Sequence, residues 1–322
     1  MDIGVEPLPQ KMLLQDVSRC YGKKVALNKI NLNIQNGEIL GYIGPNGAGK
    51  STTLRIIVGL DGEFDGSLQL NGQPLNVSKE YLLQIGYMPQ SISFAPWRTV
   101  FETLRLFGRL SGMADPRLDS RINEVAEFVE LKDALPLRCS VLSGGMAQRL
   151  NLAQALLHEP SFVILDEPFN QLDPIGRTQL KKMIHSLKSK GVTILFSSHI
   201  LSDVEELADR VAIIHNGELL FRGDLSELHR EAVKEVAFMV GLFEPVEISR
   251  LAYLSEDISA VTEIKPCHYK VAIKPEATAQ YEEIAAAFLK ATVLAGYRVR
   301  DFRITGLSLD EMFINMVGEG HE

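Results

Sequence analysis

The feature that most constrains the fold is a glycine-rich loop that directly follows a short apolar run, Glu38-Ile39-Leu40-Gly41-Tyr42-Ile43. The loop reads Gly44-Pro45-Asn46-Gly47-Ala48-Gly49-Lys50-Ser51-Thr52. Its spacing, Gly-x4-Gly-Lys-Ser, is typical of a turn from a buried strand into a helix, where glycines let successive N–H groups point at phosphate oxygens. The positive end of the following helix adds to that attraction. We therefore expect a nucleoside triphosphate site at this loop.

The last residues of the loop carry its chemistry. We expect Lys50 to neutralise the β- and γ-phosphates, and Ser51 to supply a hydroxyl to the Mg²⁺ that bridges them. The alternative is a glycine-rich turn that ends in a surface lysine. It is disfavoured because an apolar strand precedes the loop and a helix follows it.

Two adjacent carboxylates end another apolar run, Phe162-Val163-Ile164-Leu165-Asp166-Glu167-Pro168. Carboxylates that follow a parallel strand lie at the sheet edge where α/β proteins bind ligands. We expect Asp166 to hold Mg²⁺ through water, and Glu167 to polarise an attacking water as general base. An ordinary acidic strand end is the alternative.

Short apolar runs alternate with helical segments, which predicts an α/β sheet. Three of the runs lack polar alternation, as expected for parallel strands buried on both faces, and they span residues 162–165, 192–196 and 211–214. One helix should begin at Asp173-Pro174 and stop before Gly191. The pair Asn216-Gly217 indicates a two-residue hairpin near the end of this unit.

Length favours two domains. We expect a leader at 1–10, a nucleotide-binding unit at 11–228 with a helical subdomain at about 91–158, and an accessory domain at 229–322. In the accessory domain the patterns predict strands and helices in the order β-α-β-β-α-β, at 233–240, 244–255, 258–264, 268–274, 278–294 and 297–304. That order is ferredoxin-like, and another small α+β topology is the alternative.

Composition narrows the location and the partners. The net charge is −8, and no Lys/Arg block marks a nucleic-acid surface, so we expect no nucleic acid partner. The acidic N-terminus does not resemble a signal peptide, and the most apolar stretch, Ile284 to Gly296, is too short to cross a bilayer. The three widely spaced cysteines favour reduced thiols. These features predict a cytoplasmic chain.

A further motif lies just before the acidic strand, Leu142-Ser143-Gly144-Gly145-Met146-Ala147-Gln148-Arg149. Ser143 should cap a helix whose first amides are bared by Gly144 and Gly145, which makes a second anion site. The motif resembles the signature of ABC ATPases. The resemblance implies a P-loop cassette with a mixed sheet and a helical subdomain that binds ATP and Mg²⁺. It also implies that Ser143, Gly144 and Gly145 bind ATP held by a second cassette, in a dimer expected to be a homodimer.

Other residues resemble further ABC elements in the same order along the chain. The resemblance implies that Tyr21 stacks on adenine, that Gln90 contacts Mg²⁺ and the attacking water, and that His199 contacts the γ-phosphate. Asp173 resembles an aspartate at the cassette dimer interface, which is compatible with its role as a helix cap. Taken alone, Tyr21 would be a core aromatic, Gln90 a loop amide and His199 a structural histidine.

Two positions depart from the family pattern. Met146 stands where Gln is frequent, and Gln171 stands where a small residue is common in the loop before Asp173. These two departures are the only support for a third interpretation, in which the chain is a regulatory subunit that binds ATP without hydrolysing it. Because the carboxylates and His199 are all present, we expect hydrolysis instead.

Two classes of ABC protein compete, a transporter motor and a soluble ATPase that acts on ribosomes or nucleic acid. The chain has one cassette and no sustained heptads between Gly44 and Ser143, which favours the motor. Residues 95–104 resemble the transporter region that meets a membrane partner, although Trp97 and Phe101 there are equally compatible with core packing. Residues 307–313 resemble the tail of ABC-2-type exporter subunits. We therefore expect an exporter ATPase at the inner face of the cell membrane, with a separate transmembrane permease subunit.

Overall fold

The computed structural model describes residues 10–75, 78–91, 93–225, 227–228, 237–274 and 281–305. The chain divides into two compact units, Met1–Leu225 and Ser226–Glu322, and the division lies beside the boundary expected near Leu228. The expected leader, apart from Gln10, and the tail at 307–313 lie outside the described residues.

A six-stranded sheet forms the centre of the first unit. From edge to edge its strands are β10 (Glu218–Asp224), β9 (Arg210–His215), β3 (Ile39–Ile43), β8 (Thr193–Ser198), β7 (Phe162–Leu165) and β6 (Ile85–Met88). All neighbours are parallel except β10, which pairs antiparallel with β9. Every residue of β3, β7 and β8 is buried, so the expectation of parallel strands covered on both faces is confirmed.

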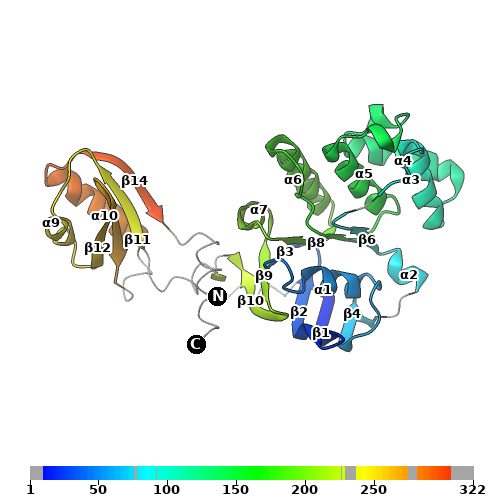
Figure 1. Cartoon of the computed structure of the whole chain (residues 1–322), viewed down its shortest axis with the longest axis horizontal. Coiled ribbons are helices and arrows are strands. Elements are labelled where there is room, and N and C mark those ends of the chain that lie inside the picture. The colour runs from blue at the N-terminus through cyan, green and yellow to red at the C-terminus, as the bar shows by residue number, and fades with distance from the viewer. Residues whose placement is uncertain are drawn as a thin grey trace, which may run out of the picture. The chain divides into compact units, whose positions relative to one another are not determined.

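A second, antiparallel sheet lies on the other side of the first helix. Its strands are β2 (Lys24–Gln35), β1 (Gln10–Tyr21), β4 (Asp65–Leu70) and β5 (Gln73–Pro74). Figure 1 shows α1 (Lys50–Ile57) between the two sheets. One apolar core joins side chains from both sheets and from α1, which fixes the start of α1 beside the end of β3.

Helices cover the opposite face of the six-stranded sheet, where Figure 1 shows α6 (Pro174–Ser189) and α7 (Leu201–Leu207). Asp173 caps α6 by accepting a hydrogen bond from the N–H of Gly176 at 2.7 Å, as the sequence predicts. Close approach of α7 to β3 requires Gly41, because a Cβ there would lie 2.5 Å from Val204. The short α2 (Lys79–Leu82) precedes β6.

The helical subdomain is inserted between β6 and β7. It contains α3 (Val100–Leu110), α4 (Asp115–Phe128), the 3-10 turns η1 (Lys132–Ala134) and η2 (Cys139–Val141), and α5 (Gly144–Leu156). Thr99 and Glu102 form a reciprocal capping box at the start of α3. Trp97, in the loop before α3, is 70% exposed, so it does not anchor the core, whereas Phe101 is half-buried.

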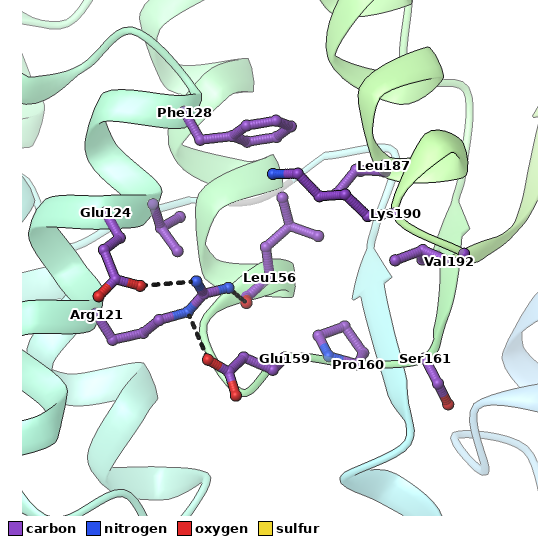
Figure 2. A pocket seen from close by; sticks show the side chains of 12 residues that line it. Arg121, Glu124, Phe128, Leu156, Glu159, Pro160, Ser161, Leu187, Lys190 and Val192 are labelled. Atoms are coloured by element: carbon purple, nitrogen blue, oxygen red, sulfur yellow. Dashed lines mark hydrogen bonds and ion pairs between the residues drawn. The ribbon is translucent and has the colours of Figure 1, made fainter.

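A cavity of about 470 Å³ lies where the helical subdomain meets the end of α6 (Figure 2). Arg121 of α4 donates to the carbonyls of Leu156 and Leu157 at 2.9 and 3.1 Å, and also contacts Glu124 and Glu159. Figure 2 shows the contacts to Glu124, Leu156 and Glu159 converging on one guanidinium. The donors of Arg121 are thus taken up by the end of α5 and by acids, which indicates that this residue has a structural role.

The predicted hairpin at Asn216-Gly217 is confirmed. Asn216 and Gly217 have φ angles of 47° and 81°, the left-handed values that a tight two-residue turn between β9 and β10 requires. The N–H of Gly217 donates to the carbonyl of Ala48 at 2.9 Å. This turn therefore supports the glycine-rich loop from behind.

Within residues 237–274 and 281–305, the second unit contains one antiparallel sheet. Its strands lie in the order β12 (Ile258–Lys265), β13 (His268–Ile273), β11 (Ala237–Leu242) and β14 (Val299–Thr305), and its helices are α9 (Ile248–Ala252) and α10 (Tyr281–Leu294). The order of elements along the chain, β-α-β-β-α-β, is the one that the sequence predicts. A single apolar core gathers residues of the strands and both helices.

The helix expected at 244–255 is wrong in extent, because α9 spans only Ile248–Ala252. The hydroxyl of Tyr269 accepts from the N–H of Val246 at 2.8 Å and donates to its carbonyl at 3.1 Å. These bonds hold Val246 outside the helix. The parts of the other predicted elements at 233–236 and 278–280 lie outside the described residues.

Candidate functional site

The glycine-rich loop links β3 to α1 in the arrangement that the sequence predicts. Gly47 and Gly49 have φ angles of 83° and 113°, which favour glycine. A Cβ on Gly44 would lie 2.3 Å from the carbonyl of Ile214, and one on Gly49 would lie 2.7 Å from the carbonyl of Ala26. The loop therefore curls tightly enough for α1 to begin at Lys50, with its N-terminal amides free for an anion.

Lys50 is nearly buried, with 5% of its surface exposed. Its Nζ atom donates to the carbonyls of Gly44 and Pro45 at 2.6 and 3.3 Å, and it lies 3.1 Å from Oε1 of Glu167. A buried ammonium needs such partners because loss of its hydration is costly. This places a positive charge between the loop and the strand-end carboxylates.

Asp166 and Glu167 follow β7 and are both buried. Oδ1 of Asp166 accepts from the hydroxyl of Ser51 at 3.2 Å and from the hydroxyl of Ser197 at 2.7 Å. Ser197 in turn accepts from the N–H of Glu167 at 2.8 Å. Glu167 has φ of 50°, a strained value for a non-glycine residue, and the hydrogen bond that its N–H donates to Ser197 helps to retain it.

His199 follows β8, next to β7 in the sheet. Its Nδ1 atom lies 2.8 Å from Oε2 of Glu167, while Oε1 of the same carboxylate faces Lys50. Glu167, at the end of β7, is thus held from two sides by Lys50, which follows β3, and by His199, which follows β8. A carboxylate held in this way can accept a proton from a water in a defined direction.

Burial raises the pKa of Asp166 above its usual value, and hydrogen bonds from Ser197 and Ser51 act in the opposite direction. The negative charge of Glu167 raises it further, whereas Lys50 lowers it. A nearby cation would therefore favour the ionised form of Asp166.

A cavity of about 400 Å³ lies over the loop and the carboxylates. It is lined by Tyr21, Lys24, Ala26, Pro45, Asn46, Gly47, Gly49, Lys50, Ser51, Thr52, Gln90 and Glu167. Tyr21 is 44% exposed, so it does not have the core role that is the alternative for an aromatic. Gln90 is exposed, which fits a loop amide as well as a residue that contacts a ligand. The structure therefore brings Tyr21, most of the glycine-rich loop, Gln90 and Glu167 to one cavity. Asp166 and His199 do not line this cavity and reach it through their contacts with Ser51 and Glu167.

The residues expected to bind Mg²⁺ are suited to it chemically. The hydroxyl of Ser51 and the carboxylate of Asp166 are hydrogen-bonded neighbours, and Gln90 lines the same cavity as Ser51. These are oxygen donors, as Mg²⁺ prefers. In the described part of the chain no cluster of three His, Cys, Asp or Glu residues offers another metal site.

The signature residues lie elsewhere on the chain's own surface. Ser143 caps α5 by accepting from the N–H of Met146 at 3.2 Å, as the sequence predicts. Ser143 and Gly144 are exposed, and none of Ser143, Gly144, Gly145 or Asp173 lines the cavity. Gly144 and Gly145 instead approach the backbone of Gln171 and the side chain of Leu172.

Gln171, the residue that departs from the family pattern, has φ of 63°. A left-handed angle at this position explains why a small residue suits the loop, since glycine adopts it without strain. The structure accommodates Gln171 with its side chain exposed. This departure leaves the contacts of Glu167 and His199 in place.

Sequence reasoning missed two contributors to the site. Ser197 bonds both carboxylate residues, yet a serine in a buried strand has no pattern that separates it from a packing residue. Lys24 lines the cavity from the start of β2, across the short turn from Tyr21. Its closeness in sequence to Tyr21 is the signal that could have indicated it.

Comparison with known proteins agrees with this geometry. A family profile described as ABC transporter matches residues 27–170. An uncharacterized ABC transporter ATP-binding protein of Bacillus subtilis (strain 168) is 35% identical over 94% of this chain and 98% of that protein. The bacitracin transport ATP-binding protein of Bacillus licheniformis is 38% identical over 70% of this chain and 73% of that protein.

Two further matches concern export and assembly. The Nod factor export ATP-binding protein I of Cupriavidus metallidurans (strain ATCC 43123 / DSM 2839 / NBRC 102507 / CH34) is 35% identical over 67% of this chain and 71% of that protein. A solved dimer of a bacterial ABC transporter cassette is 26% identical with a TM-score of 0.61, and the match covers 66% of this chain and 98% of that one. The loop, the strand-end carboxylates and these matches lead to one conclusion: the chain belongs to the ATP-binding proteins of ABC transporters.

Proposed function

We propose that this chain binds ATP with Mg²⁺, hydrolyses it, and thereby powers a transporter whose membrane-spanning part is a separate subunit. The observation that carries the proposal is the contact of Glu167 with both Lys50 and His199 beside the phosphate loop. These groups have the chemistry that phosphoryl transfer to water needs, namely a cation, a base and a residue that orients the base.

In the proposed reaction the loop amides and Lys50 bind the β- and γ-phosphates. Glu167 accepts a proton from water while the water oxygen bonds to the γ-phosphorus and the bond to the β–γ bridging oxygen breaks. ADP and inorganic phosphate are the products. His199 holds Glu167 in place through Nδ1, and Lys50 exchanges contacts with Glu167 and the loop carbonyls for phosphate oxygens.

Mg²⁺ would be held by Ser51, Gln90 and, through water, Asp166. When bound, it neutralises charge on the β- and γ-phosphates. Ser197 keeps Asp166 and the backbone of Glu167 in a fixed relation. Ser197 therefore positions both the proposed general base, Glu167, and the proposed metal-binding carboxylate, Asp166.

We propose that a second cassette, a second copy of this chain, completes each site. Support comes from the exposed start of α5, whose Ser143, Gly144 and Gly145 offer an anion site that does not belong to the chain's own cavity. The solved dimer of a related cassette is consistent with this arrangement. Closure of two copies around ATP would then move the membrane partner.

Export at the inner face of the cell membrane is the proposed setting. No helix in the described part of the chain has the length and apolar character needed to cross a bilayer, so the proposal requires a separate permease. An apolar contact for that partner is offered by exposed side chains of Trp97, which precedes α3, and of Leu106 and Leu110, which lie in α3. A relative named for Nod factor export supports the direction.

Replacing the general base tests hydrolysis. Glu167→Gln should retain ATP binding but lose turnover by roughly 100- to 10,000-fold, the usual contribution of a positioned base. Turnover is measured as phosphate release, and binding is measured by calorimetry. Glu159→Gln is the matched control, since Glu159 also has a positive φ of 57° but lies away from the cavity. Near-native turnover in Glu167→Gln would exclude this base.

The role of Ser197 can be separated from its packing. Ser197→Ala and Thr193→Ala each remove from β8 a buried hydroxyl that accepts a backbone N–H, from Glu167 and Gly37 respectively. Both should lower the free energy of unfolding by about 1–3 kcal/mol. Only Ser197→Ala should lower kcat markedly, because of these two hydroxyls only that of Ser197 bonds the carboxylate of Asp166 and the backbone of Glu167. Equal effects of the two variants on kcat would contradict a positioning role.

The transport proposal predicts a membrane partner. Affinity purification of the tagged chain from native membranes should recover a stoichiometric polytopic protein, identified by mass spectrometry. Trp97→Asp should reduce that recovery while ATP binding stays unchanged, because Trp97 is exposed and does not line the nucleotide cavity. Recovery of ribosomal proteins instead would favour a soluble ABC ATPase that acts on ribosomes or nucleic acid.

A further inference from the structure

A charged cluster lies behind Tyr21, the last residue of β1. The hydroxyl of Tyr21 donates to Oδ2 of Asp61 at 2.5 Å. Arg19 contacts the same carboxylate twice at 3.1 Å, from Nε to Oδ2 and from Nη2 to Oδ1. Its Nη1 atom donates to Glu63 at 3.0 Å. The carboxylate is 8% exposed, so this is a desolvated, bidentate pair.

The guanidinium of Arg19 also stacks on the ring of Tyr21. Its Cζ atom lies 4.5 Å from the ring centroid, within the range of a cation–π contact. Tyr21 lines the nucleotide cavity and Arg19 does not. The arginine therefore supports the ring from outside the cavity, while the ring itself stays 44% exposed.

Asp61 connects this support to the phosphate loop. It follows α1, the helix that begins at Lys50, and its N–H donates to the carbonyl of Arg55 in that helix at 3.2 Å. The ring at one end of the cavity and the phosphate-binding amides at the other are thus attached to opposite ends of one helix. Asp61 itself lies in the short segment that follows the helix, and its bond to Arg55 ties this segment to the end of α1.

Electrostatics keep the cluster charged. Burial acts to raise the pKa of Asp61, but the hydrogen bonds from Tyr21, the N–H of Glu63 and Arg19 outweigh it and hold the pKa below its usual value. Asp61 is therefore ionised at neutral pH, and the hydroxyl of Tyr21 is committed to it. What Tyr21 offers a ligand is the face of its ring.

We propose that Arg19 and Asp61 are positioning residues that hold the ring of Tyr21 in the orientation needed to stack on the nucleobase. The inference rests on the proposed function, in which Tyr21 stacks on the base of ATP. Neither residue touches the nucleotide. Their contribution is to reduce the freedom that an exposed aromatic ring would otherwise lose on binding.

The test compares two ligands, MgATP and Mg²⁺-bound inorganic triphosphate, which has no base. Binding to the full chain is measured by calorimetry in a Glu167→Gln background, so that ATP is not consumed. Tyr21→Ala should weaken MgATP roughly tenfold, as expected for loss of base stacking. Arg19→Met, Asp61→Asn and the milder Tyr21→Phe should each weaken it roughly threefold. None should change the affinity for triphosphate.

A double-mutant comparison tests whether Arg19 affects the affinity for MgATP through the ring of Tyr21. In a Tyr21→Ala background, Arg19→Met should have no further effect on MgATP binding, because the ring through which it acts is gone. Arg117→Met is the control, since Arg117 forms an ion pair with Glu159 far from the cluster in sequence and does not line the cavity. It should change neither ligand's affinity.

Several results would overturn the proposal. The first is an Arg19→Met variant that binds MgATP with native affinity. The second is an equal loss of affinity for MgATP and for triphosphate, as a general distortion of α1 would cause. The third is a further loss of MgATP affinity when Arg19→Met is added to Tyr21→Ala. A chain that binds neither ligand would contradict the nucleotide site itself. Native MgATP affinity in Tyr21→Ala would remove the stacking role of Tyr21, and the positioning role with it.

Discussion

The ion pair between Lys50 and Glu167 is the contact on which the arrangement of the site depends. It joins the helix after β3 to the end of β7, and both side chains are nearly buried. Removing two charges from water is costly unless their geometry is good and their remaining hydrogen bonds are met. Here Lys50 also bonds two loop carbonyls, and Glu167 also bonds His199. A sheet in which β8 lies between β3 and β7 is what makes these contacts possible.

The chain carries two helix starts suited to anions, and they differ in their surroundings. The start of α1 shares one cavity with the carboxylate of Glu167, the ring of Tyr21 and the amide of Gln90. The start of α5 is capped by Ser143 and has two glycines, but its residues do not line the cavity that contains Glu167. In the proposed dimer the two starts meet across one ATP. In that proposal each chain contributes one half of two ATP sites.

Local sequence patterns predicted those parts of the site that depend on local chemistry. The loop 44–52, the strand-end carboxylates, the Asp173 and Ser143 caps and the Asn216-Gly217 hairpin all follow from short-range rules, and each is present. Contacts between distant segments could not be predicted this way. The pairing of Arg19 with Asp61, the support from Ser197 and the capture of Val246 by Tyr269 depend on strand order and packing, which no single segment encodes. The exposure of Trp97 was equally undecidable from its neighbours.

The claim that two copies share each site is tested most directly by mixing two defective chains. Lys50→Ala removes the phosphate-loop cation, and Gly144→Asp places a negative charge at the exposed start of α5, where a Cβ has room. Each variant alone should be inactive in ATP hydrolysis. Mixed in equal amounts, they should recover up to about a quarter of native turnover, since half the pairs are mixed and each mixed pair has one intact site. A mixture that remains as inactive as its components, while both variants stay folded, would contradict the shared site.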